Sequence, residues 1–207
     1  MARGADPTDF VFPAASRFDE AFEGWDAGAW RNFKLDPASS AALVVELLEH
    51  MGYELERSDA YTLMKFFAKI GLFDESAANL ENRWYDDEEF RDKAEKITID
   101  SGLSLYDLMQ LRPKEAAQLA RVYRRVAYAN DEFMELPEGG KEVCVSRLCE
   151  KVLRRFYSGW ALEPFMELIR CRLPILCCDK IVEQSANGDL WRICLAAAGQ
   201  NSSDDDN

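Results

Sequence analysis

The chain has 207 residues, which is enough for one or at most two domains with a sizeable hydrophobic core. Its 38 acidic and 25 basic residues give a net charge of −13, so its average surface repels nucleic-acid phosphates and anionic lipids. A hydrophobic content of 48% argues against a wholly disordered acidic chain. We therefore expect a globular protein that binds neither nucleic acid nor membrane.

Neither end of the chain carries a recognisable targeting signal. Charged residues and proline interrupt every apolar stretch within residues 1–30, so no signal-peptide core is present there. No later apolar run reaches the roughly 18–20 residues of a membrane span. We expect an intracellular protein, cytoplasmic or also nuclear, with an irregular segment over residues 1–30.

The residue types that carry most enzyme chemistry are scarce. The single histidine, His50, excludes multi-histidine metal sites, and at a helix end it is better explained as a cap or surface residue than as a general base. None of the six cysteines forms a C-x-x-C pair, which disfavours zinc. Glycines 139 and 140 precede Lys141, but glutamates at 135 and 142 exclude a phosphate-binding loop. The sequence predicts no enzyme, no metal site and no cofactor.

Helical spacing of apolar residues dominates the sequence after residue 36. Asp36 and Pro37 predict the start of a helix that Gly52 ends. Ser58 or Asp59 starts the next helix, and Gly71 ends it. Residues 31–95 also contain a run, 44–55, that resembles the second helix and turn of an ankyrin repeat. The ankyrin T-P-L-H signature is missing, so we interpret this region as one degenerate unit that depends on the rest of the chain.

The middle of the chain alternates acidic and helical segments. Residues 74–100 are strongly acidic and predict a solvated face or an exposed connection. Ser104 and Asp107 have the spacing of a capping box, so a short helix is expected there. A helix over residues 114–128 carries a basic patch, which suits either an acidic partner or this protein's own acidic segment. Residues 136–140 are the best candidate for a linker.

Four further helices are expected, over residues 143–156, 162–169, 175–184 and 190–198, before an acidic disordered tail at 199–207. Strand signals are almost absent, so the predicted fold class is all-α. Pro174 and Asp189 predict two helix starts near the chain end. Each of these helices has one apolar face, and such faces suit binding of a helix in a partner's groove.

Residues 96–198 resemble the PRANC region at the C-termini of ankyrin proteins from poxviruses, parasitoid wasps and bacterial endosymbionts. The resemblance is carried by Ser104-Leu105-Tyr106-Asp107-Leu108, by Leu173-Pro174 and by Asp189-Leu190-Trp191. The last part is also similar to the start of an F-box, a surface that engages the linker subunit of cullin–RING ubiquitin ligases. The resemblance implies an all-α helical array, with a degenerate ankyrin-like N-terminal part and an F-box-like C-terminal bundle.

The same resemblance implies an adaptor that joins a target protein to a ubiquitin ligase. Its implied partner-binding residues are Leu173, Pro174, Ile181, Val182, Leu190, Trp191 and Ile193. The alternative is an ankyrin-type sequestering inhibitor or regulator of a signalling or transcription factor, without a ligase. Exposure of these residues as an apolar patch would favour binding, and burial would assign them to the core.

Overall fold

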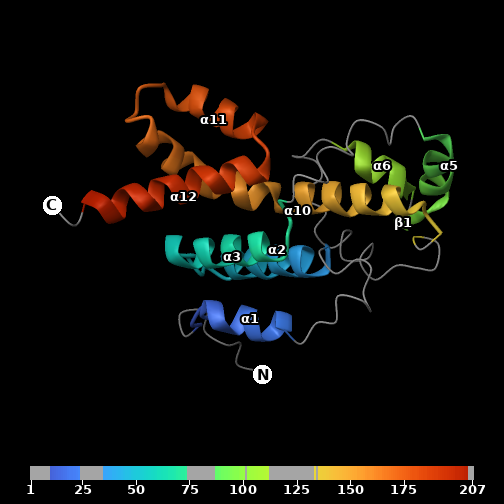
Figure 1. Ribbon diagram of the computed structural model, residues 1–207, viewed down its shortest axis with the longest axis horizontal. Coiled ribbons are helices and arrows are strands. Elements are labelled where there is room, and N and C mark those ends of the chain that lie inside the picture. Colours follow the sequence, from blue (N-terminus) through green and yellow to red (C-terminus); the bar gives the residue numbers. More distant parts are fainter. Residues whose placement is uncertain are drawn as a thin grey trace. The chain divides into compact units, whose positions relative to one another are not determined.

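The computed structural model describes residues 10–23, 35–73, 87–100, 102–111, 133 and 135–204. The chain divides into two compact units, Met1–Val152 (unit 1) and Leu153–Asn207 (unit 2), which are treated separately below. Within the described residues there are eight helices and two short strands (Figure 1). The predicted predominance of helix is confirmed, and one small antiparallel ladder is an addition to it.

Unit 1 begins with three helices, α1 (Ala15–Glu23), α2 (Leu35–His50) and α3 (Arg57–Lys69). The expectation of an irregular N-terminal segment was wrong over α1, which packs on α3. The rings of Phe18 and Phe66 lie 5.4 Å apart between centroids, and Lys69 Nζ lies 2.6 Å from Asp19 Oδ1. These contacts join positions about fifty residues apart, so no local pattern in the N-terminal sequence indicates them.

The glycines predicted to end α2 and α3 do so. Gly52 (φ 88°) and Gly71 (φ 72°) adopt the left-handed conformation that follows many helices. At the end of α2 the N–H of Tyr53 donates to the carbonyl of Leu48 at 2.9 Å, and that of Gly52 to Glu49 at 3.0 Å. This pair of bonds is a Schellman motif, and α3 ends with the same pattern, in which Leu72 donates to Phe67 at 3.2 Å.

The helix starts differ by one or two residues from those predicted. Helix α2 already includes Leu35, so Asp36 lies in its first turn. Helix α3 begins at Arg57, and its N-cap is Glu56, whose N–H donates to Asp59 Oδ2 at 3.4 Å. Asp59 therefore closes a capping box from the third helical position and does not occupy the cap itself.

The segment expected to be an exposed acidic connection is partly a helix, α5 (Glu88–Lys96). Asp87 starts it by accepting a hydrogen bond from the N–H of Phe90 at 3.1 Å. Phe90 and Ala94, one turn apart, are fully buried, so the helix has an inner apolar face despite its acidic outer one. Residues 74–86 lie outside the described part of the chain.

A short hairpin connects α5 to α6 (Leu105–Gln110). It pairs β1 (Thr98–Asp100) with β2 (Leu103–Ser104), with Thr98 opposite Ser104. The predicted capping box at the start of α6 is confirmed, because the N–H of Asp107 donates to Ser104 Oγ at 3.1 Å and the N–H of Ser104 to Asp107 Oδ2 at 3.2 Å.

Helix α10 (Glu138–Leu168) is a single helix of 31 residues where two were expected, and it contains Pro164. Of the expected linker at 136–140, residues 138–140 are instead the first turn of this helix. Gly140 is needed there for close packing, because a Cβ at this position would stand 2.4 Å from Cδ2 of the buried Phe90. The boundary between the two units falls within α10. The predicted helix at 114–128 and its basic patch lie outside the described residues.

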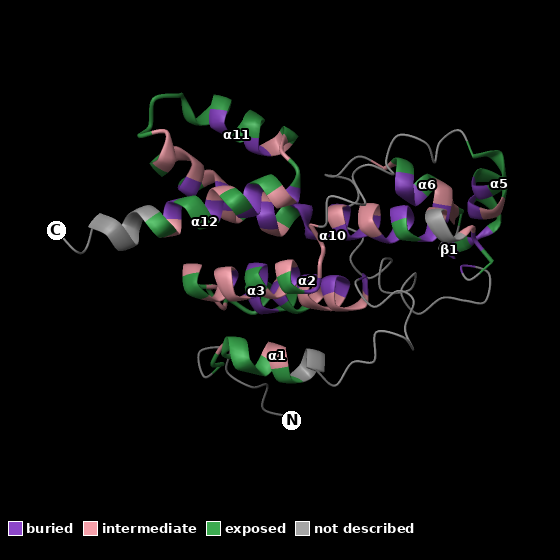
Figure 2. Ribbon diagram, viewed as in Figure 1, coloured by how far each residue is buried: buried purple, intermediate pink, exposed green. Residues whose placement is uncertain are grey.

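Unit 2 contains the end of α10, α11 (Ile175–Gln184) and α12 (Asn187–Asp204). Its buried residues include Leu153, Tyr157, Ala161, Cys178, Val182, Leu190, Cys194 and Ala197. Helix α12 starts two residues before Asp189 and continues beyond 198, where a disordered tail was expected. The run Leu195–Ala198 consists of strong helix formers, which favours this extension. Figure 2 shows that α11, in contrast, has mostly exposed residues.

Candidate functional site

The turn between α10 and α11 is held by a third Schellman motif. The N–H of Cys171 donates to the carbonyl of Met166, and that of Arg170 to Glu167, both at 2.9 Å. The position that glycine occupies at the ends of α2 and α3 is Arg170 here, with a φ of 52°, and Cys171 has the same φ. For residues with a side chain this conformation costs roughly 1–2 kcal/mol each. The turn is therefore strained at two successive residues.

Pro174 starts α11 as its N-cap, one position earlier than a first helical residue. Its carbonyl accepts the N–H of Cys177 at 2.9 Å and of Cys178 at 3.2 Å. Cys178 and Val182, one turn apart, form the inner side of the helix and are buried. The register of α11 is thus fixed by two inward residues, and the remaining side chains point away from the core.

Four large aliphatic side chains in α11 or just before it are exposed, among polar residues such as Asp179 and Lys180. Leu176 is 75% exposed, Ile175 56%, and Leu173 and Ile181 about 40%. We call these four residues the α11 apolar face; Pro174 and Cys177, which lie between them in the sequence, are also exposed. An exposed cluster of large aliphatic side chains on one helix is the usual sign of an interaction surface.

Arg154 fixes the far end of α11. It is only 7% exposed, and its guanidinium donates to the carbonyls of Val182 and Glu183, both at 2.7 Å, and to that of Ser185. A further bond of 3.3 Å reaches Oδ1 of Asn187 at the start of α12. A cation at a helix C-terminus satisfies unpaired carbonyls and opposes the helix dipole, so Arg154 holds α11 and α12 in place within unit 2.

The residues implied by the F-box resemblance divide into two groups. Leu173, Pro174 and Ile181 are exposed, whereas Val182, Leu190 and Trp191 are buried and Ile193 is half-buried. Leu190 and Trp191 of α12 therefore lie in the core of unit 2, and Ile193 lies at its edge. Sequence reasoning did not single out Leu176, the most exposed of the four. Leu176 does not share the helical spacing of the other apolar residues of α11, and its outward direction follows only once Cys178 is known to point inward.

A second exposed apolar row lies on α2 in unit 1. Val44, Leu47 and Met51 follow one another at helical spacing and are 51%, 58% and 45% exposed. We call them the α2 apolar stripe. The buried side of α2 is a different row that includes Ala38, Ala42, Val45 and Leu48. Its two alanines carry little side-chain bulk, which suits a closely packed face.

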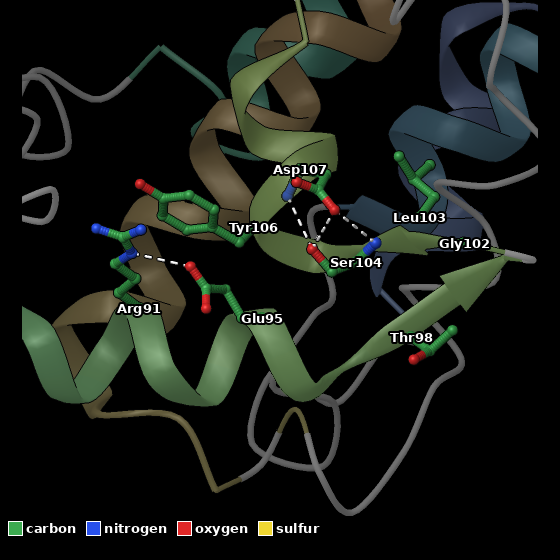
Figure 3. A pocket seen from close by; sticks show the side chains of 8 residues that line it. All are labelled: Arg91, Glu95, Thr98, Gly102, Leu103, Ser104, Tyr106 and Asp107. Carbon is green, nitrogen blue, oxygen red and sulfur yellow. Dashed lines mark hydrogen bonds and ion pairs between the residues drawn. The ribbon is translucent and has the colours of Figure 1, made fainter.

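A polar groove of about 510 Å³ lies between α5 and the start of α6 (Figure 3). Its charged groups already bind one another: Arg91 Nε lies 2.9 Å from Glu95 Oε1, and Ser104 Oγ donates to Asp107 Oδ2 at 2.7 Å. The Arg91 guanidinium also stands 5.3 Å from the centre of the Tyr106 ring. Donation from the hydroxyl and the N–H of Ser104 lowers the pKa of Asp107. The polar groups that line this groove therefore serve to hold α5, the hairpin and α6 together.

Among the described residues no group of histidine, cysteine and acidic residues could hold a metal ion, and no helix is long and apolar enough to cross a membrane. All six cysteines are free thiols, and burial raises the pKa of Cys144 well above its ordinary value. His50 is an exposed residue at the end of α2.

No family model, curated protein or solved structure matches the chain.

Proposed function

We propose that this protein is a non-enzymatic adaptor that links a target protein to a cullin–RING ubiquitin ligase through its C-terminal helices. The observation that carries the proposal is the α11 apolar face. It begins at Leu173, which with Pro174 forms the Leu-Pro part of the PRANC-like resemblance, and its four side chains are all exposed. The ligase linker subunit is the partner that this resemblance implies, and the finer F-box-like and ankyrin-like descriptions of the two parts belong to the same proposal.

The energetics of the α11 apolar face favour a protein partner. Full burial of a leucine or isoleucine side chain contributes about 1.5–3 kcal/mol. Leu176 and Ile175 have most of that contribution still to gain, because they are 75% and 56% exposed. Aliphatic anchors on a helix that is fixed at both ends, by the strained turn and by Arg154, lose little further conformational freedom on binding.

The α2 apolar stripe supports the second half of an adaptor, the part that holds a target. It lies in unit 1, and the α11 apolar face lies in unit 2, so the two surfaces are built from separate bodies. A sequestering inhibitor, the alternative, needs the α2 apolar stripe alone. The two functions therefore differ in whether the α11 apolar face has a partner.

The proposal is tested with the purified chain and a purified ligase linker subunit in a calorimetric titration. Leu176→Asp should weaken binding at least tenfold, because it places a charge at the most exposed residue of the face. Leu195→Asp is the matched control: Leu195 is 42% exposed on α12 of the same unit. Circular dichroism checks that both variants stay folded. Equal binding by Leu176→Asp and the wild type would overturn the assignment.

A second variant separates the two candidate functions. In an adaptor, Leu47→Asp on the α2 apolar stripe leaves the affinity for the linker subunit unchanged, since Leu47 lies in the other unit. Absence of any binding between the wild type and the linker subunit would refute the adaptor and leave the sequestering function. Loss of linker binding in Leu47→Asp alone would move the docking surface to α2.

A further inference from the structure

The basic side chains of unit 2 differ in whether they have a partner within the protein. Arg154 is committed to the end of α11, and Arg192 pairs with Asp189 at 3.1 Å. The side chains of Arg170, Arg172 and Lys180, in contrast, make no hydrogen bond or ion pair with the described part of the chain. All three are exposed and lie beside the α11 apolar face, in the turn before it or on the helix itself. The unpaired positive charge of unit 2 is therefore gathered around its exposed apolar side chains.

Arg170 is the most informative of the three. Helices α2 and α3 end in the same Schellman motif with Gly52 and Gly71 at the left-handed position, so glycine is the residue this backbone favours. Arginine there costs stability, and its side chain is exposed and makes no hydrogen bond or ion pair with the described residues. A charged side chain held in a strained turn next to a docking face points to a role in binding.

We infer that the partner's groove has an apolar floor and a rim of carboxylates, and that Arg170 and Arg172 pair with that rim. This inference rests on the proposed function and adds the charge of the partner. The sign of the local charge supports it: residues 170–182, between Glu167 and Glu183, contain Arg170, Arg172 and Lys180 but only one acid, Asp179, in a chain whose net charge is −13. Complementary rim charges steer association and exclude partners with a basic rim.

An anionic membrane also has an apolar interior and a negatively charged border. The net charge of the whole chain decides between a membrane and a protein as the partner. A bilayer presents its charge over an area far wider than α11, so it also meets the net charge of −13 and repels it. A protein groove meets only the residues it encloses. The observations therefore favour an acidic protein groove over an acidic lipid surface.

The test uses the full chain and the purified linker subunit, titrated at 50, 150 and 500 mM NaCl. The key variant is Arg170→Gly, which removes the charge while giving the turn its preferred residue, so its melting temperature should equal or exceed that of the wild type. It should bind about two- to fivefold more weakly at 50 mM NaCl, as expected for one exposed ion pair, and the difference should shrink at 500 mM. Arg192→Gln, at an exposed pair on α12, is the control and should bind as the wild type does.

The outcomes separate this inference from the function it rests on. If the linker subunit binds the wild type and Arg170→Gly equally, with no dependence on salt, the carboxylate rim is wrong while the adaptor stands. Absence of binding to the wild type overturns both. A parallel flotation assay uses vesicles of phosphatidylcholine with and without phosphatidylserine: flotation that needs phosphatidylserine and Arg170, without binding of the linker subunit, would make the ligand an anionic lipid and overturn the protein groove.

Discussion

Replacement of Arg154 by methionine should release the C-terminal end of α11. Methionine fills a similar volume but donates no hydrogen bond, so the carbonyls of Val182, Glu183 and Ser185 and the Oδ1 atom of Asn187 lose this partner. Val182 and Asn187 are each only 1% exposed, so water does not readily replace the guanidinium at these two residues. The other two carbonyls belong to half-buried residues, which water reaches more easily.

The size of the effect follows from these bonds. A buried acceptor that loses its donor costs at most about 1–3 kcal/mol, and the cost is lower where water or another donor replaces it, as the N–H of Ser185 does at 3.4 Å from the carbonyl of Val182. Removal of the buried charge returns part of this sum, because its own desolvation cost disappears. The expected loss is about 3 kcal/mol in the free energy of opening α11, which corresponds to roughly a hundredfold faster amide exchange.

Hydrogen exchange read by mass spectrometry on peptides covering residues 175–184 measures this directly. Arg154→Lys should give an intermediate loss, because one ammonium group reaches only part of the acceptor set. Arg192→Met is the matched control, since its pair with Asp189 is more than half exposed on both sides and contributes about 0–1 kcal/mol. Protection of α11 in Arg154→Met within threefold of the wild type would refute this account of how the helix is fixed.

Three other predictions concern packing, protonation and thiol access. In urea unfolding, Gly140→Ala should destabilise unit 1 by about 1–3 kcal/mol because its Cβ would meet Phe90, whereas Gly159→Ala in the same helix has open space and should stabilise by up to about 1 kcal/mol; equal effects would contradict the packing role of Gly140. The lowered pKa of Asp107 means that its bonds to Ser104 stabilise the fold fully above the ordinary carboxyl pKa, near 3.9, and are lost as pH falls through the lowered value; the stability difference between the wild type and Asp107→Asn should therefore shrink below about pH 4, and a difference that grows on acidification would be inconsistent with it. Iodoacetamide should modify the folded protein only at its exposed thiols, Cys171 and Cys177. Labelling of Cys144 in the folded protein would contradict its burial.

The elements predicted correctly from sequence are those with a local signal. Gly52 and Gly71 end their helices because a left-handed residue is needed there and glycine adopts it freely. Ser104 and Asp107 bond each other three residues apart, so their spacing alone specifies the start of α6. In each case the physics is contained within one turn of the chain.

The errors arise where distant contacts decide. Helix α1 packs on Phe66 of α3, and position 140 requires glycine because the Phe90 ring lies against it. The turn after α10 contains no glycine, so no residue in it predicts the left-handed conformation of Arg170. A sequence pattern reports what a residue favours locally, and these positions are set by what another segment imposes on them.

The candidate site shows the same division more sharply. Both α11 and α12 carry an apolar face near the chain end, and the sequence gives no basis for choosing which becomes core. In the structure Leu190 is fully buried and Leu176 is 75% exposed. The difference is decided by which neighbours cover each helix, a property of the assembled unit rather than of either segment.

The net charge of −13 gains a physical role once the two exposed apolar surfaces are known. Leu47 and Leu176 each lie more than half exposed, and such side chains favour self-association in a protein of low charge. Repulsion between like-charged copies opposes that association without altering either surface. Arg170 and Arg172 place positive charge beside the α11 apolar face, so an acidic partner is attracted to this face while the net negative charge of the chain still repels other copies.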